Sequence, residues 1–278
     1  MPELATLKIS SRDFAHLSAL VKERFGLVLD TSKQQMVTTR LSKRLRELNY
    51  ESFTDYYRHV TSDASGAALK DMVDALTTKF TSFFREAEHF ELLRKIASED
   101  SDSNPLRVWS AACATGEEPY SIVITLLEAL QNQPDRAIEV VASDVSNRAL
   151  QRAAEGLYQA EQLATLPRHL ARKYFLKGEG KWHGWFCVKR ELRKHIEFRQ
   201  INLMDALPSQ AAFSVIFCRN VMIYFDRDGQ ESVVNRLVPS LEPNGYLFIG
   251  HAEGLAGVKH PLQYIQPAVY RRVSGRDR

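Results

Sequence analysis

The sequence predicts an α/β protein: a doubly wound, mostly parallel sheet with a small all-helical N-terminal domain and a small antiparallel β insert. Residues 1–76 show only helical periodicity. Residues 107–249 alternate short apolar runs with helical segments, which is typical of a parallel sheet covered by helices. Residues 168–199 break that alternation with three glycines and ten basic residues. We therefore expect domains at 1–76 and 77–278, with 168–199 inserted into the second.

Length and composition limit the class of protein. A chain of 278 residues suits one large domain or two unequal ones, and 44% hydrophobic with 26% charged residues excludes a disordered or fibrous protein. The net charge of +3 is too small to indicate nucleic acid as a partner. Neither a secretory signal nor an apolar run long enough to span a bilayer is present. We expect a cytoplasmic protein without membrane insertion.

The cysteines argue against two further classes. Cys113, Cys187 and Cys218 lie far apart and form no CxxC pair. This spacing is incompatible with both a disulfide framework and a zinc finger. We therefore expect a reducing compartment and no bound metal.

Apolar residues in the first third recur at helical spacing in four segments. The first segment starts with the capping pattern SSRD at 10–13 and can end at Gly26. The four stripes are Phe14, Leu17, Val21 and Phe25; Val37, Leu41, Leu45 and Leu48; Phe53, Tyr56, Tyr57 and Val60; and Leu69, Met72, Val73 and Leu76. A fifth helix is expected around Phe90 and Leu93, before a polar loop at 98–105.

The second domain shows the strand and helix signals of a parallel sheet. The expected strands are 107–111, 138–143, 196–201, 213–218 and 246–249. Helices are expected between most of them, for example at 120–130, 147–155 and 229–241. Residues 264–273 read as one further strand that closes the sheet edge.

The insert at 168–199 is strongly basic. It holds ten Lys or Arg residues against three Glu, a net charge of +7. Two interpretations stay open. The stretch is either a solvated basic surface or a docking patch for an acidic or C-terminal-carboxylate ligand that adds to a strand edge.

The segment WSAACATGEEPYS (109–121) carries the strongest local signal. It predicts a strand, a tight loop of small residues and then a helix, which brings backbone N–H groups toward a ligand. Gly116 is its single glycine, so the GxGxxG dinucleotide fingerprint is absent. Asp144 ends the next expected strand, where a carboxylate can accept both ribose hydroxyls. The pattern indicates an adenosyl-type ligand, with an ordinary turn and a surface aspartate as the alternative.

Six segments together resemble one family, the chemotaxis receptor (methyl-accepting chemotaxis protein) glutamate O-methyltransferases. They are TTKFTSFFRE (77–86), WSAACATGEEPYS (109–121), ASD (142–144), INL (201–203), FCRNVMIYFD (217–226) and YLFIGHAEGL (246–255). The resemblance implies an S-adenosylmethionine-dependent methyltransferase sheet. It also implies transfer of methyl groups to glutamates on cytoplasmic helices of chemoreceptors, giving glutamate methyl esters and S-adenosylhomocysteine in chemotactic adaptation.

The resemblance implies a cofactor site at ten positions. They are Lys79, Thr81, Arg85, Glu118, Asp144, Asn202, Leu203, Cys218, Arg219 and Asn220. Asn202 and Leu203 would lie beside the adenine, and residues 218–220 would line the floor under the methionine part. Lys79 departs from the family's usual TTN stretch, so a contact that needs an amide side chain is not expected there.

The resemblance further implies Arg85 and Tyr224 as catalytic residues. A glutamate with an ordinary pKa near ~4.3 is already ionised at neutral pH, so the acceptor needs no general base. Joining a carboxylate to a sulfonium methyl neutralises both charges, so exclusion of water and in-line alignment favour the step. We therefore expect Arg85 and Tyr224 to position groups rather than move protons. By local pattern alone, Tyr224 is a core aromatic.

The second expected helix has a basic face opposite its apolar stripe. Arg40, Lys43 and Arg44 carry it. A solvated helix face is one interpretation. The resemblance makes the same face a substrate dock for glutamate-bearing receptor helices, and it also permits a receptor C-terminal peptide at the β insert.

Two other functions stay open at this point. One is a nucleic-acid or small-molecule methyltransferase on the same fold, although CRNVMIY (218–224) stands where base methyltransferases carry a D/N-P-P-Y/F motif. The other is a binding module that senses S-adenosylmethionine without turnover, against which the presence of both Arg85 and Tyr224 argues.

Overall fold

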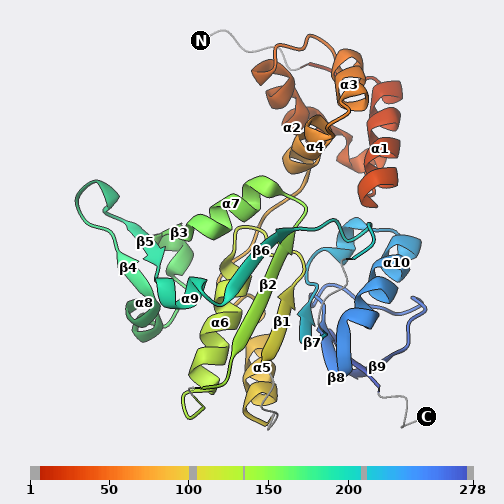
Figure 1. Cartoon of the computed structure of the whole chain (residues 1–278). Coiled ribbons are helices and arrows are strands. Elements are labelled where there is room, and N and C mark those ends of the chain that lie inside the picture. The colour runs from red at the N-terminus through yellow and green to blue at the C-terminus, as the bar shows by residue number, and fades with distance from the viewer. Residues whose placement is uncertain (1–6, 100–104, 134, 208–211, 274–278) are drawn as a thin grey trace. The chain divides into compact units, whose positions relative to one another are not determined.

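The structure of the protein, a computed structural model, describes residues 7–99, 105–133, 135–207 and 212–273. The chain divides into two compact units (Figure 1). The helical unit consists of Met1–Thr78 together with Tyr224–Gly229, and the sheet unit consists of Lys79–Ile223 and Gln230–Arg278.

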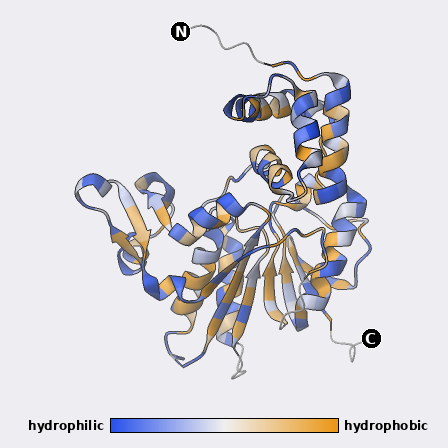
Figure 2. Cartoon of the chain, turned by 45° about the horizontal axis from the view of Figure 1, so that its top comes forward, coloured by the Kyte–Doolittle hydropathy of each residue, from blue (hydrophilic) through white to orange (hydrophobic). Residues whose placement is uncertain are grey.

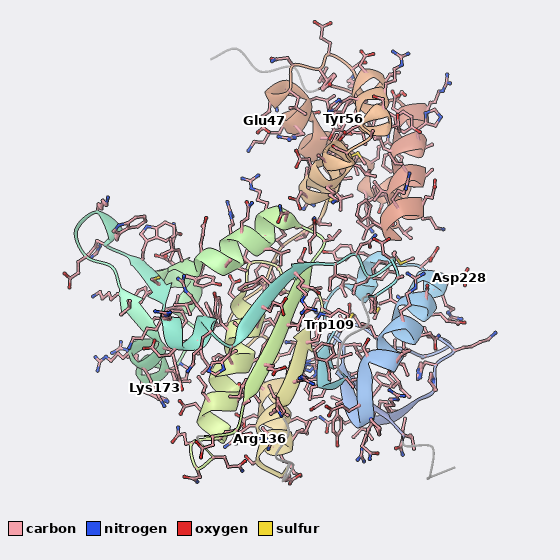
Figure 3. The ribbon with its side chains drawn as sticks, viewed as in Figure 1. Glu47, Tyr56, Trp109, Arg136, Lys173 and Asp228 are labelled. Atoms are coloured by element: carbon pink, nitrogen blue, oxygen red, sulfur yellow. The ribbon has the colours of Figure 1, made fainter. Side chains whose placement is uncertain are left out.

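The helices of the helical unit follow the four apolar stripes of the sequence. They are α1 (Ser11–Phe25), α2 (Gln34–Glu47), α3 (Phe53–Ser62) and α4 (Ala67–Leu76), with a 3-10 turn at Thr31–Lys33. Ser10 and Ser52 cap α1 and α3 by accepting a backbone N–H three residues on. Gly26, with φ 67°, ends α1. Tyr56 is buried in this unit (Figure 3), whereas Leu48 is 38% exposed because α2 ends one residue before it.

A short segment from late in the chain belongs to the helical unit. The Val28 N–H donates to the Tyr224 carbonyl at 2.8 Å. Lys22 Nζ lies 2.7 Å from Asp226 Oδ2 in an exposed ion pair. These contacts tie the segment 224–229 to the end of α1 and the residues after it.

The sheet unit is built on a seven-stranded sheet in the order β6-β2-β1-β7-β8-β10-β9. The strands are β1 (Leu106–Ser110), β2 (Ile138–Asp144), β6 (Ile196–Gln200), β7 (Phe213–Phe217), β8 (Leu241–Phe248), β9 (Leu262–Gln266) and β10 (Val269–Arg272). Pairs among β6, β2, β1, β7 and β8 are parallel, and β10 pairs antiparallel with β8 and β9. The predicted mostly parallel sheet is confirmed.

The main core lies between this sheet and helices of the same unit. They are α5 (Ala87–Glu99) and α6 (Glu117–Ala129), whereas Leu150 of α7 (Asn147–Glu155) packs in a smaller cluster with Cys113 and Ala142. Leu93 of α5, Ile122 of α6 and Val140 of β2 have exposed fractions of 2% or less, and they belong to one continuous cluster. Figure 2 shows the strands as largely hydrophobic. Full burial of each such aliphatic side chain stabilises the fold by about 1.5–3 kcal/mol.

Three element boundaries differ from the sequence prediction. Residues 264–273, expected as one strand, form the hairpin β9–β10, because Ala268 at φ 62° turns the chain. The helix expected at 229–241 is α10 (Arg227–Leu237), and Leu241 already begins β8. The loop expected at 98–105 starts later, because α5 extends to Glu99, and residues 100–104 lie outside the described residues.

The small antiparallel sheet is confirmed but draws on a wider stretch than 168–199. Its order is β3-β5-β4, with β3 (Leu157–Gln159), β4 (Phe175–Lys177) and β5 (Trp185–Val188). The helices α8 (Arg168–Tyr174) and α9 (Arg190–Arg193) flank it. The expected range missed β3, which is too short to show a strand period, and it included the start of β6.

The strand order fixes where a ligand can bind. The chain leaves β1 toward β2 on one side, and β7 lies on the other side, so the connections diverge at the carboxyl ends of β1 and β7. Open α/β sheets bind ligands in the crevice at such a switch point. No helix among the described residues is long and apolar enough to cross a membrane.

Candidate active site

The loop after β1 (111–116) is fixed by hydrogen bonds to its surroundings. The Ala111 N–H donates to the last carbonyl of β7 at 2.8 Å, and the Cys113 N–H donates to a β2 carbonyl at 2.9 Å. The Tyr158 hydroxyl of β3 donates to the Thr115 carbonyl at 2.8 Å. Strand, loop and α6 therefore form the predicted arrangement, with the loop shape set by three separate strands.

Gly116 holds a conformation and a space that a side chain would disturb. Its φ is 99°, and an added Cβ would lie 2.7 Å from the Ala153 Cβ and 2.9 Å from the Tyr158 hydroxyl oxygen. Both the positive φ and the close approach require glycine here. This contact packs the start of α6 against α7 and β3.

Replacing Gly116 with alanine is expected to lower the free energy of unfolding by about 2–4 kcal/mol, from backbone strain and overpacking together. The matched control is Gly180→Ala, because Gly180 has φ 57° with nothing within 4 Å of an added Cβ. Urea denaturation of both variants measures the difference. Equal losses in the two variants would show that the close approach at Gly116 contributes nothing.

Asp144 stands where β2 meets this loop. Its Oδ2 accepts the Ala114 N–H at 2.9 Å and its Oδ1 accepts the Ser146 N–H at 2.9 Å. Ala114 has φ 46°, which turns its N–H toward the carboxylate. The structure thus brings the predicted ribose acid and the cofactor loop together.

A buried arginine links two further predicted cofactor residues. The Arg219 side chain is 1% exposed and lies between Glu86, at 2.9 Å from Oε2, and Glu118, at 3.1 Å from Oε2. It also donates to the Arg85 carbonyl at 2.5 Å. Ser110, the last residue of β1, donates to Glu118 at 2.7 Å. Arg219 therefore connects the ends of β1 and β7 with the joining segment near Arg85.

The two carboxylates respond differently to this arginine. Burial raises the pKa of Glu86, but the hydrogen bond and charge of Arg219 more than offset it, so the pKa lies below its usual value. Burial raises the pKa of Glu118 above its usual value, and the opposing effects of Arg219 and Ser110 do not cancel the shift. Glu86 was not among the predicted site residues.

The joining segment that carries Lys79, Thr81 and Arg85 is anchored at its phenylalanines. Phe83 is 1% exposed and packs edge-on against Tyr158, with ring centroids 4.9 Å apart. The Phe84 N–H donates to the Ser121 hydroxyl of α6 at 3.0 Å. The Arg85 guanidinium donates to the Phe80 carbonyl at 3.1 Å and lies over the Phe80 ring. Lys79 and Thr81 line a cavity beside the loop 111–116.

Three predicted cofactor residues have their side chains turned into the protein or into a local turn. Asn202 accepts the Met204 N–H at 3.1 Å and donates to Asp205 at 3.2 Å. Leu203 is 7% exposed, and Cys218 is fully buried, with burial raising the pKa of its thiol well above the usual value. Contacts to a ligand from these positions would therefore use the backbone or an edge of the side chain.

Glu253, which was not among the predicted site residues, shapes the loop after β7. Its carboxylate accepts four backbone N–H groups: Asn220 at 2.8 Å, Met222 at 2.7 Å, Ile223 at 3.3 Å and Gly250 at 2.5 Å. Asn220 adopts φ 56° and donates from its side chain to Glu86 at 3.2 Å. Burial raises the pKa of Glu253, against the lowering effect of these hydrogen bonds.

Tyr224 and the predicted docking residues lie in the helical unit. Arg40 donates to the Leu76 carbonyl and, at 2.9 Å, to the Thr78 hydroxyl, so it caps the end of α4. Arg44 pairs with Asp71 and is 3.3 Å from Glu47. Lys43 is exposed. The roles of these residues stay predictions.

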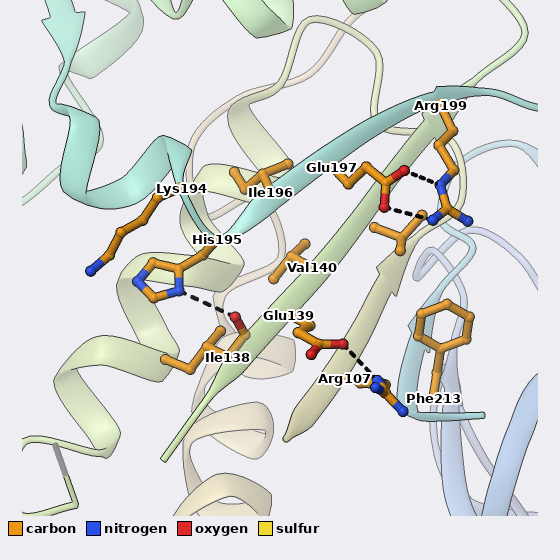
Figure 4. Close-up of a pocket in the computed structure, with 11 residues that line it drawn as sticks. Arg107, Ile138, Glu139, Val140, Lys194, His195, Ile196, Glu197, Arg199 and Phe213 are labelled. Atoms are coloured by element: carbon orange, nitrogen blue, oxygen red, sulfur yellow. Dashed lines mark hydrogen bonds and ion pairs between the residues drawn. The ribbon is translucent and has the colours of Figure 1, made fainter. Parts of the chain in front are cut away.

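A second cavity, of about 450 Å³, lies at the opposite end of the strands (Figure 4). Both of its arginines are paired with carboxylates: Arg107 with Glu139 at 2.7 Å, and Arg199 with Glu197 at 2.6 Å. His195 Nδ1 lies 3.2 Å from the Ile138 carbonyl oxygen. Because ligands of this sheet class bind at carboxyl ends, we place the active site at the loop 111–116 instead.

The sheet and its site define an S-adenosylmethionine-dependent methyltransferase. Two features fit an adenosyl ligand. The loop after β1 contains Gly116, where neighbouring atoms leave no room for a side chain, and Asp144 at the end of β2 accepts a hydrogen bond from that loop. The chain belongs to the CheR family: "CheR methyltransferase, SAM binding domain" matches residues 79–270, and "CheR methyltransferase, all-alpha domain" matches residues 12–77.

Curated relatives match nearly the whole chain. "Chemotaxis protein methyltransferase 2" of Pseudomonas aeruginosa is 43% identical over 260 residues, covering 93% of this chain and 92% of the relative. "Chemotaxis protein methyltransferase" of Salmonella typhimurium is 40% identical over 265 residues, covering 95% and 91%. The Escherichia coli K12 protein of the same name is 39% identical over 265 residues, covering 95% and 92%.

Proposed function

We propose that this methyltransferase acts in the cytoplasm on glutamate side chains of chemoreceptors, forming glutamate methyl esters and S-adenosylhomocysteine in chemotactic adaptation. The observation that carries the proposal is the match of the whole chain, including the helical unit, to proteins named chemotaxis protein methyltransferases. Sequence motifs from the joining segment to the stretch around Glu253 support the same acceptor.

Different residues would contact different parts of the cofactor. Asp144 would hold the ribose, and Asn202 with Leu203 would flank the adenine. Residues 218–220 would line the floor under the methionine part. Arg85 and Glu118 are further proposed cofactor contacts, and Arg219 donates to the Arg85 carbonyl and to the Glu118 carboxylate. The cofactor supplies a methyl group on a positively charged sulfur. Arg85 would orient the acceptor carboxylate and exclude water, and no proton has to move. Tyr224 is the other proposed catalytic residue, with a positioning role.

The experiment that tests the acceptor uses methyl-labelled S-adenosylmethionine and membranes that contain a cognate receptor. Mild alkali then hydrolyses carboxyl esters but leaves methylated nitrogen intact. We expect the label on the receptor to be released as methanol. Alkali-stable label would reject the ester, and absence of label would favour the binding module without turnover.

We also propose that the exposed face of α2 docks the receptor helix. Lys43 is the residue that tests this best, because Arg40 and Arg44 also hold the helical unit together. Lys43→Glu is expected to raise the KM for receptor about three- to tenfold at low ionic strength, with less effect in salt. Arg12→Glu, at an exposed position of α1, is the control. An unchanged receptor KM at low salt would exclude this face.

A receptor C-terminal peptide is the proposed ligand of the small sheet. β3 and β4 are its edge strands, and a cavity of about 210 Å³ on it is lined by Leu176, Trp182 and Phe186. Leu176 is 57% exposed, which leaves apolar surface for a peptide side chain. Titration with a synthetic receptor C-terminal peptide should show binding that Leu176→Glu abolishes. Equal binding to both proteins would place the peptide elsewhere.

A further inference from the structure

A large cavity adjoins the cofactor loop on the side of α7 and the small sheet. Its volume is about 800 Å³. Its wall includes Thr81 of the joining segment, Thr115 of the loop 111–116, Arg148 and Arg152 of α7, and Trp182 and Trp185 of the small sheet. All of these residues belong to the sheet unit. The cavity therefore shares a wall with the proposed cofactor site.

Two arginines that make no ion pair with any described residue form the basic side of the cavity. Arg148 and Arg152 are one helical turn apart on α7, and both are exposed. Neither guanidinium has a hydrogen bond or an ion pair with any residue that the structure describes. In the 450 Å³ cavity, by contrast, Arg107 and Arg199 each have a carboxylate partner.

The acidic residues at this cavity offset the arginines only in part. Glu117 is 1% exposed and is held by the Thr115 hydroxyl at 2.7 Å and by Gln162 at 3.1 Å. Burial raises the pKa of Glu117 above its usual value, against the lowering effect of the hydrogen bonds from Thr115 and Gln162. Glu155 lies on the same face of α7 at the rim. Neither glutamate forms an ion pair with Arg148 or Arg152, so the cavity presents two unpaired guanidinium groups among the described residues.

Exposed aromatic side chains line the same cavity as the arginines. Phe80 is 74% exposed and Trp182 is 47% exposed, and both line the cavity. Apolar rings left in contact with water beside unpaired arginines favour a ligand that combines carboxylates with apolar side chains. An acidic stretch of polypeptide has this chemistry.

The cavity is distinct from the adenosyl end of the proposed cofactor site. Asp144, Asn202 and Leu203 are absent from its lining, and of the ten proposed cofactor residues only Lys79 and Thr81 line it. A ligand in the cavity would therefore lie next to the cofactor rather than in its place.

We propose that this cavity binds a carboxylate-bearing segment of the substrate protein that flanks the glutamate to be methylated. The inference rests on the proposed function, because a glutamate-bearing receptor helix supplies the complementary charge. It adds a second substrate contact, on the sheet unit, to the one proposed for α2. Arg148 and Arg152 then set specificity for acidic neighbours of the methylated residue.

The test is the double charge reversal Arg148→Glu with Arg152→Glu in the full-length chain. Methylation of a receptor cytoplasmic fragment without its C-terminal tail is measured at low ionic strength. We expect the KM for the fragment to rise at least about tenfold, with kcat and the KM for S-adenosylmethionine within about twofold of wild type. The increase should shrink as salt is added.

The matched control is Arg168→Glu with Arg172→Glu, two exposed arginines with the same spacing on α8 that do not line the cavity. Thermal unfolding of both variants checks that they are folded, and Arg148→Gln with Arg152→Gln gives a milder change.

An unchanged fragment KM in the α7 variants, or an equal rise in the control, overturns the inference. A rise in the KM for S-adenosylmethionine instead assigns the cavity to the cofactor. If the wild-type chain makes no ester on any receptor, the proposed function fails, and this inference fails with it.

Discussion

Arg219→Met is expected to destabilise the sheet unit by about 3–5 kcal/mol, because it leaves two carboxylates without their shared cation. Glu86 and Glu118 both lie within 3.1 Å of this guanidinium, and their side chains are 14% and 13% exposed. Methionine fills much of the volume but offers no charge and no donor to the Arg85 carbonyl. The expected loss comes mainly from buried, unpaired acid groups.

The same variant should bind S-adenosylhomocysteine at least about 100-fold more weakly, because Arg219 fixes both Glu118 and the backbone at Arg85. Urea denaturation and calorimetric titration measure the two effects. Arg199→Met is the control, since its pair with Glu197 is on the surface and contributes about 0–1 kcal/mol. Product affinity within threefold of wild type would show that Arg219 does not organise the site.

Glu253→Gln is expected to lower kcat/KM about 10- to 100-fold. The carboxylate accepts backbone N–H groups on both oxygens, and an amide keeps one acceptor while turning an NH₂ group toward donors. Each buried donor left without a partner costs about 1–3 kcal/mol. Because Asn220 sits at φ 56°, we expect the loop after β7 to relax once it loses this anchor.

Kinetics of the Glu253 variant separate positioning from folding. If Glu253 positions the loop, kcat/KM should fall while the variant keeps its circular dichroism spectrum. Glu88→Gln, at an exposed position on α5, should leave both unchanged. If Glu253→Gln shows wild-type kinetics, the loop after β7 keeps its shape without the four hydrogen bonds to this carboxylate.

Local sequence signals predicted the elements that repeat a period, and they missed those that depend on distant partners. The apolar stripes located α1 to α4, and apolar runs located β1, β2 and β7. β3 is three residues long and exists because it pairs with β5, which no local period reveals. The turn at Ala268 splits an apparently continuous strand, because this alanine adopts φ 62°, which its residue type does not indicate.

The site shows the same division. Gly116 and Asp144 were found from their places after a strand, because topology brings the carboxyl ends of parallel strands together. Glu86 and Glu253 were missed as site residues because their roles depend on nonlocal contacts. Arg219, for example, reaches Glu118 across 101 residues of sequence. For Arg40, the sequence showed a basic face but could not show that its guanidinium caps α4.

The most direct test of the account is mass spectrometry of a cognate receptor after incubation with the purified chain and S-adenosylmethionine. Fragmentation of the receptor peptides locates each added methyl group. We expect methyl groups on glutamate side chains of the receptor's cytoplasmic helices, and their loss after mild alkali. Methyl groups on lysine, arginine or an N-terminus, or an unmodified receptor beside an active control enzyme, would contradict the account.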